Sequence, residues 1–267
     1  RPSASVNYVA THDGFTLADV TAYEQKHNEA NGENNADGHN ENCSANWGVE
    51  GPTEDAQINA TRARVARSML ASVFTSLGTP MLAAGDEFGR SQQGNNNAYC
   101  QDNALSWLDW HLAESEEGRV LTAFTARLIA LRRQHPLLRD TRFLRGDVDV
   151  SPGIKDVDWF DERGEPLTSE AWQDPQARAL TLRRAGRDLD GNIEVLLLMH
   201  NGSETDLMFS PPAPRLEWNV LADSTDPGSP AHRLDGEQMR VGAHGFALLA
   251  AQPPQPERSP HAGAAGA

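Results

Sequence analysis

The sequence has few cysteines and no long apolar run. Its 267 residues include two cysteines, Cys43 and Cys100, which are too few for a disulfide framework and lack the spacing of metal ligands. No stretch approaches the roughly 18 uninterrupted apolar residues of a membrane-spanning helix. These absences favour a reduced, intracellular protein with no membrane segment.

Basic residues are also scarce. Lys and Arg number 23 against 38 Asp and Glu, which gives a formal net charge of −15. A nucleic-acid-binding protein needs a basic face to displace counterions from phosphate, so we expect no nucleic-acid partner. Hydrophobic residues make up 38% of the chain, enough to bury a core, and the length allows one large domain or two ordinary ones.

The start of the chain carries its own expectation. It begins Arg1-Pro2-Ser3, without Met or the apolar run of a signal peptide, and enters an apolar segment at residue 6. We therefore expect that the sequence is missing its beginning.

Strand and helix patterns alternate in the first half. The apolar runs 6–10 and 79–84 predict buried strands, and the spacing of apolar residues predicts helices over 54–77 and 116–134. Residues 15–23 allow one or two further helical turns. This order is typical of an α/β domain with parallel strands.

The pattern changes after about residue 139. Apolar and polar residues alternate over short segments separated by Pro and Gly, which predicts an antiparallel β-sandwich over 139–251. Pro, Ala and Gly dominate residues 252–267, where we expect a disordered tail.

Polar segments follow the predicted strands. They are the pair His12-Asp13, a loop over 27–51 with seven Asn, and Gly85-Asp86-Glu87 with an Asn-rich continuation over 91–103. In parallel α/β folds the chemistry lies at such strand ends. Amides, carboxylates and nearby aromatic rings bind sugar hydroxyls and ring faces, and a carboxylate stabilises the charge that develops in glycoside cleavage.

Each of these features also has an ordinary structural explanation. A His-Asp pair is common by chance, and Asp86 with Glu87 fits a satisfied pair at a strand end. Cys100 fits a small buried side chain, and Trp107 and Trp110 fit core or inter-domain packing. Composition and spacing alone therefore favour a carbohydrate-active α/β domain without deciding for it.

Longer motifs resemble a known family. Residues 6–17, which contain Thr-His-Asp-Gly, resemble the strand-seven motif of isoamylase-type debranching enzymes of the alpha-amylase superfamily. Residues 27–34 resemble the loop that follows it. Residues 78–103, from Gly-Thr-Pro-Met-Leu through Gly-Asp-Glu-Phe-Gly to Tyr-Cys-Gln-Asp-Asn, are similar to strand eight and its loop in bacterial glycogen debranching enzymes of the GlgX type. The resemblance is sharp over 5–110 and weaker to 250.

The resemblance implies a fold of the class α/β plus all-β. Residues 1–138 would be the C-terminal part of a (β/α)8 TIM barrel, with strands seven and eight and their helices. An antiparallel β-sandwich domain over 139–251 would follow. It also implies a cytoplasmic enzyme, since bacterial glycogen is cytoplasmic.

The resemblance assigns roles to individual residues. Asp13 matches the catalytic carboxylate that stabilises the transition state, and His12 matches the neighbouring substrate-binding histidine. Asp102 is a candidate ligand of a glucose hydroxyl, and Glu87 is interpreted as a structural residue of the strand-eight loop. No metal and no organic cofactor are implied.

The implied reaction is hydrolysis of α-1,6 branch linkages in glycogen or its limit dextrin, with retention of configuration. The nucleophile and general acid of this family come from barrel strands four and five, which precede this segment, so we expect the chain alone to be inactive. We also expect it to aggregate or be partly molten, with the sandwich able to fold by itself. The alternatives are a non-catalytic glucan-binding remnant, a starch isoamylase or a trehalose-pathway debranching enzyme.

Overall fold

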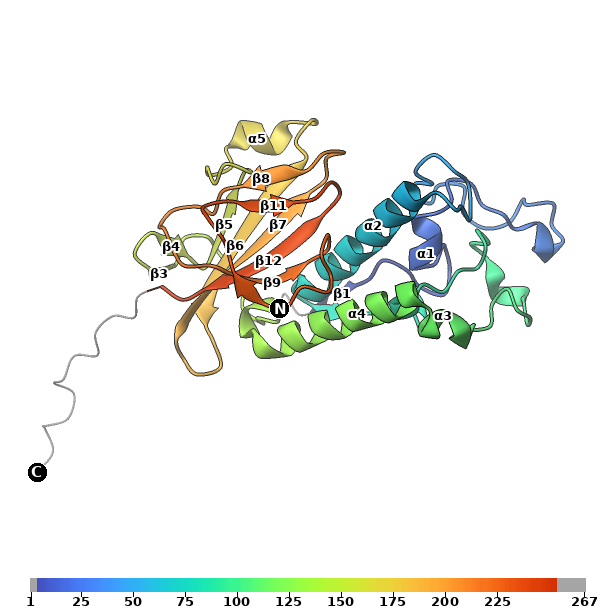
Figure 1. The fold of residues 1–267 in the computed structure, drawn as a ribbon, viewed down its shortest axis with the longest axis horizontal. Coiled ribbons are helices and arrows are strands. Elements are labelled where there is room, and N and C mark those ends of the chain that lie inside the picture. The colour runs from blue at the N-terminus through green and yellow to red at the C-terminus, as the bar shows by residue number, and fades with distance from the viewer. Residues whose placement is uncertain (1–3, 254–267) are drawn as a thin grey trace, which may run out of the picture.

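A computed structural model describes residues 4–253 (Figure 1). An antiparallel sheet lies on one side of two long helices, α2 (Ala56–Thr75) and α4 (Glu116–Gln134), and irregular loops extend from the far end of the helices. Most of the predicted tail, residues 254–267, lies outside the described residues.

The N-terminal half contains one parallel strand pair. β1 (Val6–Asn7) pairs with β2 (Thr79–Pro80), and α2 connects them, which confirms the predicted strand–helix–strand order. Both strands are shorter than predicted, and Val6 and Tyr8 are 53% and 52% exposed. The prediction of buried strands is wrong here because, within residues 4–253, no further parallel strand flanks the pair.

The long helices have clear end signals. The Asp55 carboxylate accepts from the first N–H groups of α2, and the Ser115 hydroxyl accepts from Gly118 N–H at the start of α4. The bounds of α4 agree with the prediction, whereas the segment 15–23 gives only the short helix α1 (Leu17–Val20). No helix in the described part of the chain is long and apolar enough to cross a membrane.

The C-terminal half is an antiparallel sandwich, as predicted. Its large sheet has the strand order β10-β9-β12-β7-β6-β5, and the pairs β8–β11 and β3–β4 lie outside it. The strands of the large sheet are β5 (Val157–Phe160), β6 (Ala179–Arg187), β7 (Ile193–Asn201), β9 (Asn219–Asp223), β10 (His232–Arg233) and β12 (Phe246–Ala251). The remaining strands and α-helices are β3 (Asp149–Ser151), β4 (Ile154–Lys155), β8 (Leu207–Phe209), β11 (Met239–Val241), α3 (Trp110–Glu114) and α5 (Ser169–Gln173). Short 3-10 helices form over Glu29–Asn31, Asp86–Phe88, Ala98–Cys100 and Pro136–Leu138.

The large sheet is buried on both faces. On one face Leu196 and Leu198 of β7 belong to the same core as Leu128 of α4. On the other face Leu197 packs in a second core with Phe209 of β8. Successive side chains of a strand point to opposite faces, so the almost wholly apolar run of β7 follows from two-sided burial.

Polar contacts reinforce the junction between α2 and the sheet domain. Arg184 donates to the Thr75 carbonyl at 2.7 Å, Arg67 to the Ser224 carbonyl at 2.7 Å, and Ser68 to the His244 carbonyl at 2.9 Å. Separating the sandwich from the helices would break these hydrogen bonds and would also expose the apolar sheet face that packs against α4. This argues against the expectation that the sandwich folds by itself.

The shared core gives a first stability prediction. We expect Leu128→Ala to lower the free energy of unfolding by about 2–5 kcal/mol, because it leaves a cavity where the helix meets the sheet. The neighbouring Ile129 is 41% exposed, so Ile129→Ala should cost less than about 1 kcal/mol. Urea unfolding followed by circular dichroism measures both, and equal losses would contradict a core shared across the junction.

Candidate functional site

Two irregular loops meet where β1 and β2 end, and a pair of amides joins them. Asn28 Nδ2 donates to Asn96 Oδ1 at 2.9 Å, and Asn96 N–H donates to Asn28 Oδ1 at 3.0 Å. Both residues are buried. The Asn96 carbonyl in turn accepts from Gly14 N–H at 2.9 Å. The second loop is thus tied both to the first loop and to the residue that follows Asp13.

Further amides extend this network. Asp37 Oδ2 accepts from Asn31 Nδ2 at 2.7 Å and from Asn97 Nδ2 at 2.8 Å. Asn31 Oδ1 accepts from Asn95 at 2.9 Å and from Gln101 at 2.8 Å. Several of the amides that we predicted as sugar-binding groups therefore hold the loops in place.

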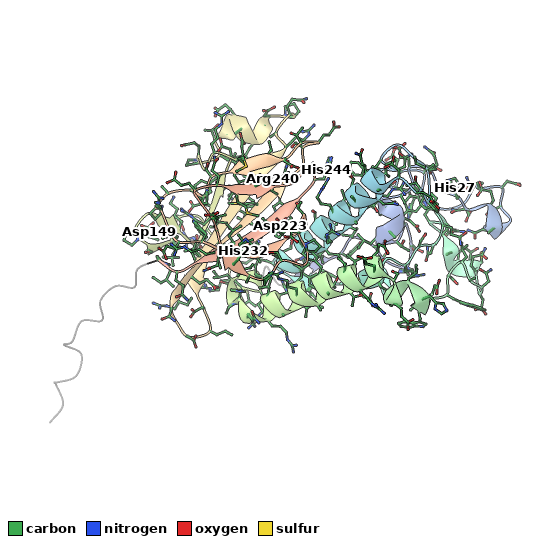
Figure 2. The ribbon with its side chains drawn as sticks, viewed as in Figure 1. His27, Asp149, Asp223, His232, Arg240 and His244 are labelled. Atoms are coloured by element: carbon green, nitrogen blue, oxygen red, sulfur yellow. The ribbon has the colours of Figure 1, made fainter. Side chains whose placement is uncertain are left out.

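Charged groups close the base of the first loop. The Glu50 carboxylate accepts from the backbone N–H groups of residues 24–25 and lies 3.0 Å from His27 Nε2 (Figure 2). Burial opposes ionisation, but these hydrogen bonds prevail and lower the pKa of Glu50 to about 2. Arg62 donates to three carbonyls within residues 46–51. This end of the loop is therefore fixed by ionised side chains.

His12 and Asp13 lie together on the surface beyond β1. His12 Nε2 is 3.3 Å from Asp13 Oδ2, and their side chains are 90% and 56% exposed. The Thr11 hydroxyl donates to the Asp13 carbonyl at 3.0 Å. A carboxylate and an imidazole are thus presented side by side, accessible to a ligand.

Asp102 has a partner that the sequence did not indicate. Its Oδ1 accepts from the indole N–H of Trp107 at 3.0 Å, and both residues are exposed. Trp107 and Trp110 are 60% and 67% exposed, so neither is a core side chain of residues 4–253, and packing against another domain stays a prediction. Cys100 is exposed as well, not buried. Among the described residues, no layer of structure covers this side of the loop.

The carboxylates after β2 serve the fold. Asp86 Oδ1 accepts from Leu17 N–H at 3.1 Å, and burial raises the pKa of Asp86 to about 6. Glu87 Oε2 accepts from Gly85 N–H at 2.9 Å, and the Glu87 carbonyl accepts from Thr122. These contacts agree with the structural role expected for Glu87. Within residues 4–253 no group of three or more His, Cys, Asp or Glu could hold a metal ion.

The first loop also contacts the sheet domain. The rings of Trp47 and His244 lie 4.7 Å apart between centroids, and Figure 2 shows His244 at the edge of the sheet domain beside α2. Trp47 therefore helps to join the two halves of the molecule. The sequence offered no signal for this contact, since the two residues are distant along the chain.

The chain is similar in sequence to known proteins. The sequence profile described as "Isoamylase, C-terminal" matches residues 156–248. This part of the chain is therefore similar to the C-terminal domain of isoamylases. The chain is 43% identical over 238 residues to "Glycogen operon protein GlgX homolog" of Mycobacterium tuberculosis (strain ATCC 25618 / H37Rv), covering 85% of the chain and 33% of the relative. It is 42% identical over 254 residues to "Glycogen debranching enzyme" of Dickeya chrysanthemi, covering 94% and 35%.

Solved structures show the same fold at lower identity. The chain superposes on a pullulanase from Bacillus acidopullulyticus with a TM-score of 0.59 at 18% identity, over 93% of this chain and 24% of that one. Pullulanase type I from Bacillus subtilis str. 168, complexed with maltose, gives 0.59 at 20%, over 94% and 28%. The chain thus spans about one third of the length of the curated relatives it matches. The resemblance to the isoamylase-like debranching enzymes is confirmed.

The amide pair gives a second prediction. Asn96→Ala removes the side-chain acceptor of Asn28 Nδ2 and the donor to the His39 carbonyl and Asn42 Oδ1, so we expect a loss of about 1–3 kcal/mol of unfolding free energy. Hydrogen exchange should accelerate over residues 27–42, with helix α4 unchanged. Gln93→Ala is the control, because Gln93 lies at an exposed position of the same loop and its side chain makes no hydrogen bond to the described residues; it should leave exchange over 27–42 unaltered.

The buried Asp86 gives a prediction about pH. Its folded-state pKa of about 6 lies above the ordinary value of 3.8, so the ionised form disfavours folding. This penalty is absent at low pH and grows as the pH rises from 4 through 6. Asp86→Asn keeps an oxygen for Leu17 N–H without the charge. We expect the variant to gain about 1–3 kcal/mol over the wild type between pH 4 and pH 7.

Chemical unfolding at several pH values measures this difference. Ile129→Ala, which changes no titratable group, is the control and should differ from the wild type by a constant amount. A constant difference for Asp86→Asn would show that Asp86 ionises in the folded protein at no cost.

Proposed function

We propose that this chain is the C-terminal part of a glycogen debranching enzyme. Residues 1–138 would complete a (β/α)8 barrel with its seventh and eighth strands, and residues 139–251 would be the C-terminal sandwich. The parallel pair β1–β2 connected by α2, with α4 following, supports the barrel. The names of relatives at 42–43% identity support the debranching activity.

The proposed reaction is hydrolysis of α-1,6 linkages at branch points of glycogen or limit dextrin. The exposed Asp13 carboxylate, presented after β1 beside His12, is the observation that carries this proposal. Cleavage develops positive charge on the sugar ring, and a carboxylate held beside that ring stabilises it. His12 would hydrogen-bond a hydroxyl of the same sugar. Asp102, on the neighbouring loop, would contribute to substrate binding.

The surrounding structure favours such a role. Gly14, directly after Asp13, is fixed by the Asn96 carbonyl, so the backbone carrying the carboxylate does not need to reorganise when charge develops. A bound glucan would displace water from the carboxylate, which strengthens its attraction to the developing charge.

The remaining catalytic groups would come from outside this segment. A retaining glycoside hydrolase uses a nucleophile and a general acid about 5 Å apart. We propose that the preceding barrel strands of the enzyme supply both, that the segment alone does not hydrolyse glucan, and that it uses no organic cofactor. A glycogen substrate also implies a cytoplasmic enzyme.

A chimera tests this function. The matched segment of the Dickeya chrysanthemi relative is replaced by residues 4–253, and release of reducing ends from a branched limit dextrin is measured. We expect hydrolysis by the chimera and a loss of at least about a hundredfold in kcat with Asp13→Asn. Asp147→Asn, at an exposed carboxylate paired with Arg145, is the matched control and should leave kcat unchanged.

The outcomes separate the possible functions. Full activity of Asp13→Asn would remove Asp13 from catalysis. A folded chimera that binds limit dextrin without cleaving it would favour a non-catalytic glucan-binding segment. Preference for amylopectin over limit dextrin would favour a starch isoamylase.

A further inference from the structure

The segment over residues 99–110 presents large aromatic side chains to solvent. Tyr99, Trp107 and Trp110 are 75%, 60% and 67% exposed. Large aromatic side chains are mostly buried in folded proteins. Several exposed aromatic side chains on one segment are typical of a binding surface. Tyr99 and Trp107 lie in the segment between β2 and α3, beside the amide network of the candidate site, and Trp110 is the first residue of α3.

Trp107 differs from the other two because its ring is held by a charged group. The indole N–H donates to Asp102 Oδ1 at 3.0 Å, and the Trp107 backbone N–H donates to the Asn103 carbonyl at 3.0 Å. A hydrogen bond to a carboxylate is stronger than one between neutral groups. The edge of the ring is therefore fixed while most of the residue stays accessible, which lowers the entropy lost when a ligand stacks on it.

The turn that carries this pair is fixed to the rest of the site. Gln101 Nε2 donates to the Ala30 carbonyl at 2.9 Å and to Asn31 Oδ1 at 2.8 Å. The Ser106 hydroxyl donates to the Gln101 carbonyl at 2.5 Å. Residues 101–107 are thereby anchored to the first loop, the same loop that the Asn28–Asn96 pair connects to the backbone next to Asp13.

We propose that Trp107 is a stacking platform for an α-glucan chain and that Asp102 is a positioning residue that orients its ring. The face of an indole ring covers the apolar C–H face of a pyranose, while sugar hydroxyls reach the amides around it. Asp102 then acts on the ligand through Trp107 and not as a direct ligand of a glucose hydroxyl. The choice of α-glucan as ligand rests on the proposed function.

Trp110 provides a matched control in the same segment. Trp110, the first residue of α3, is as exposed as Trp107, but its ring lies 5.6 Å from the Phe88 ring between centroids. Within residues 4–253 no carboxylate accepts a hydrogen bond from its indole N–H. Substituting each tryptophan in turn therefore compares a ring fixed at its edge by Asp102 with an exposed ring that no carboxylate of the described residues fixes.

Isothermal titration of the chimera with maltoheptaose tests the proposal. We expect Trp107→Ala to weaken binding roughly tenfold and Trp110→Ala to change it less than about twofold. Asp102→Ala should weaken binding by a similar factor to Trp107→Ala. Asp102→Asn should restore most of the affinity, because its amide oxygen still accepts from the indole N–H.

Other results would overturn the proposal. If Asp102→Asn binds as weakly as Asp102→Ala, the charge itself contacts the sugar and the positioning role fails. If Trp107→Ala binds like the wild type, or no weaker than Trp110→Ala, the platform fails. Thermal unfolding of each variant shows that its fold is intact.

This experiment can fail independently of the debranching proposal. A chimera that cleaves limit dextrin, but whose binding of maltoheptaose Trp107→Ala does not weaken, overturns the platform and leaves the debranching proposal standing. A chimera that does not cleave limit dextrin, but binds maltoheptaose through Trp107, leaves the platform standing and removes the debranching activity.

Discussion

The reciprocal hydrogen bonds between Asn28 and Asn96 fix the geometry on which the candidate site depends. The two loops have little regular structure, so strand ladders cannot satisfy their polar groups, and buried amides take over that role. A buried amide without a partner costs several kcal/mol, which makes the paired arrangement strongly preferred over a loosened one. The pair also leaves no room beside it. A Cβ at Gly38 would lie 2.2 Å from Asn96 Oδ1, and its φ of +72° also favours glycine.

The sheet domain extends this constraint to the whole molecule. One face of the sheet buries the same core as α2 and α4, and Trp47 of the first loop packs on His244 at the edge of that domain. Helices α2 and α4, which connect and follow the two short strands, are thus packed against the large sheet. A C-terminal sandwich of this kind supports the loops as well as adding surface, because removing it would expose the apolar sides of both helices.

The sequence predicted regular elements well and polar contacts poorly, for physical reasons. Helix α4 follows from a repeated apolar spacing, a Ser cap and a Pro stop, which are all local signals. The exposure of Val6 and Trp107 does not follow from local sequence. The same apolar residue is buried or exposed depending on whether another layer of structure covers it. The amide pairing joins residues 68 positions apart, and no periodicity connects them. The motif resemblance could assign a role to Asp13 because it draws on a longer pattern than local propensity, and that role stays a prediction.

The two kinds of polar residue in the site therefore act in different ways. The Asn-rich loops were attractive as sugar-binding segments because amides both donate and accept, yet several of their amides are already satisfied by one another. What remains for a ligand is a smaller exposed set: His12, Asp13 and the ring that Asp102 holds. The buried amides of these loops hydrogen-bond one another and so hold the few exposed groups in place. Binding of a ligand then does not have to supply the energy to order those groups. Changes in the framework should alter substrate binding and catalysis together, whereas changes among the exposed groups can separate the two.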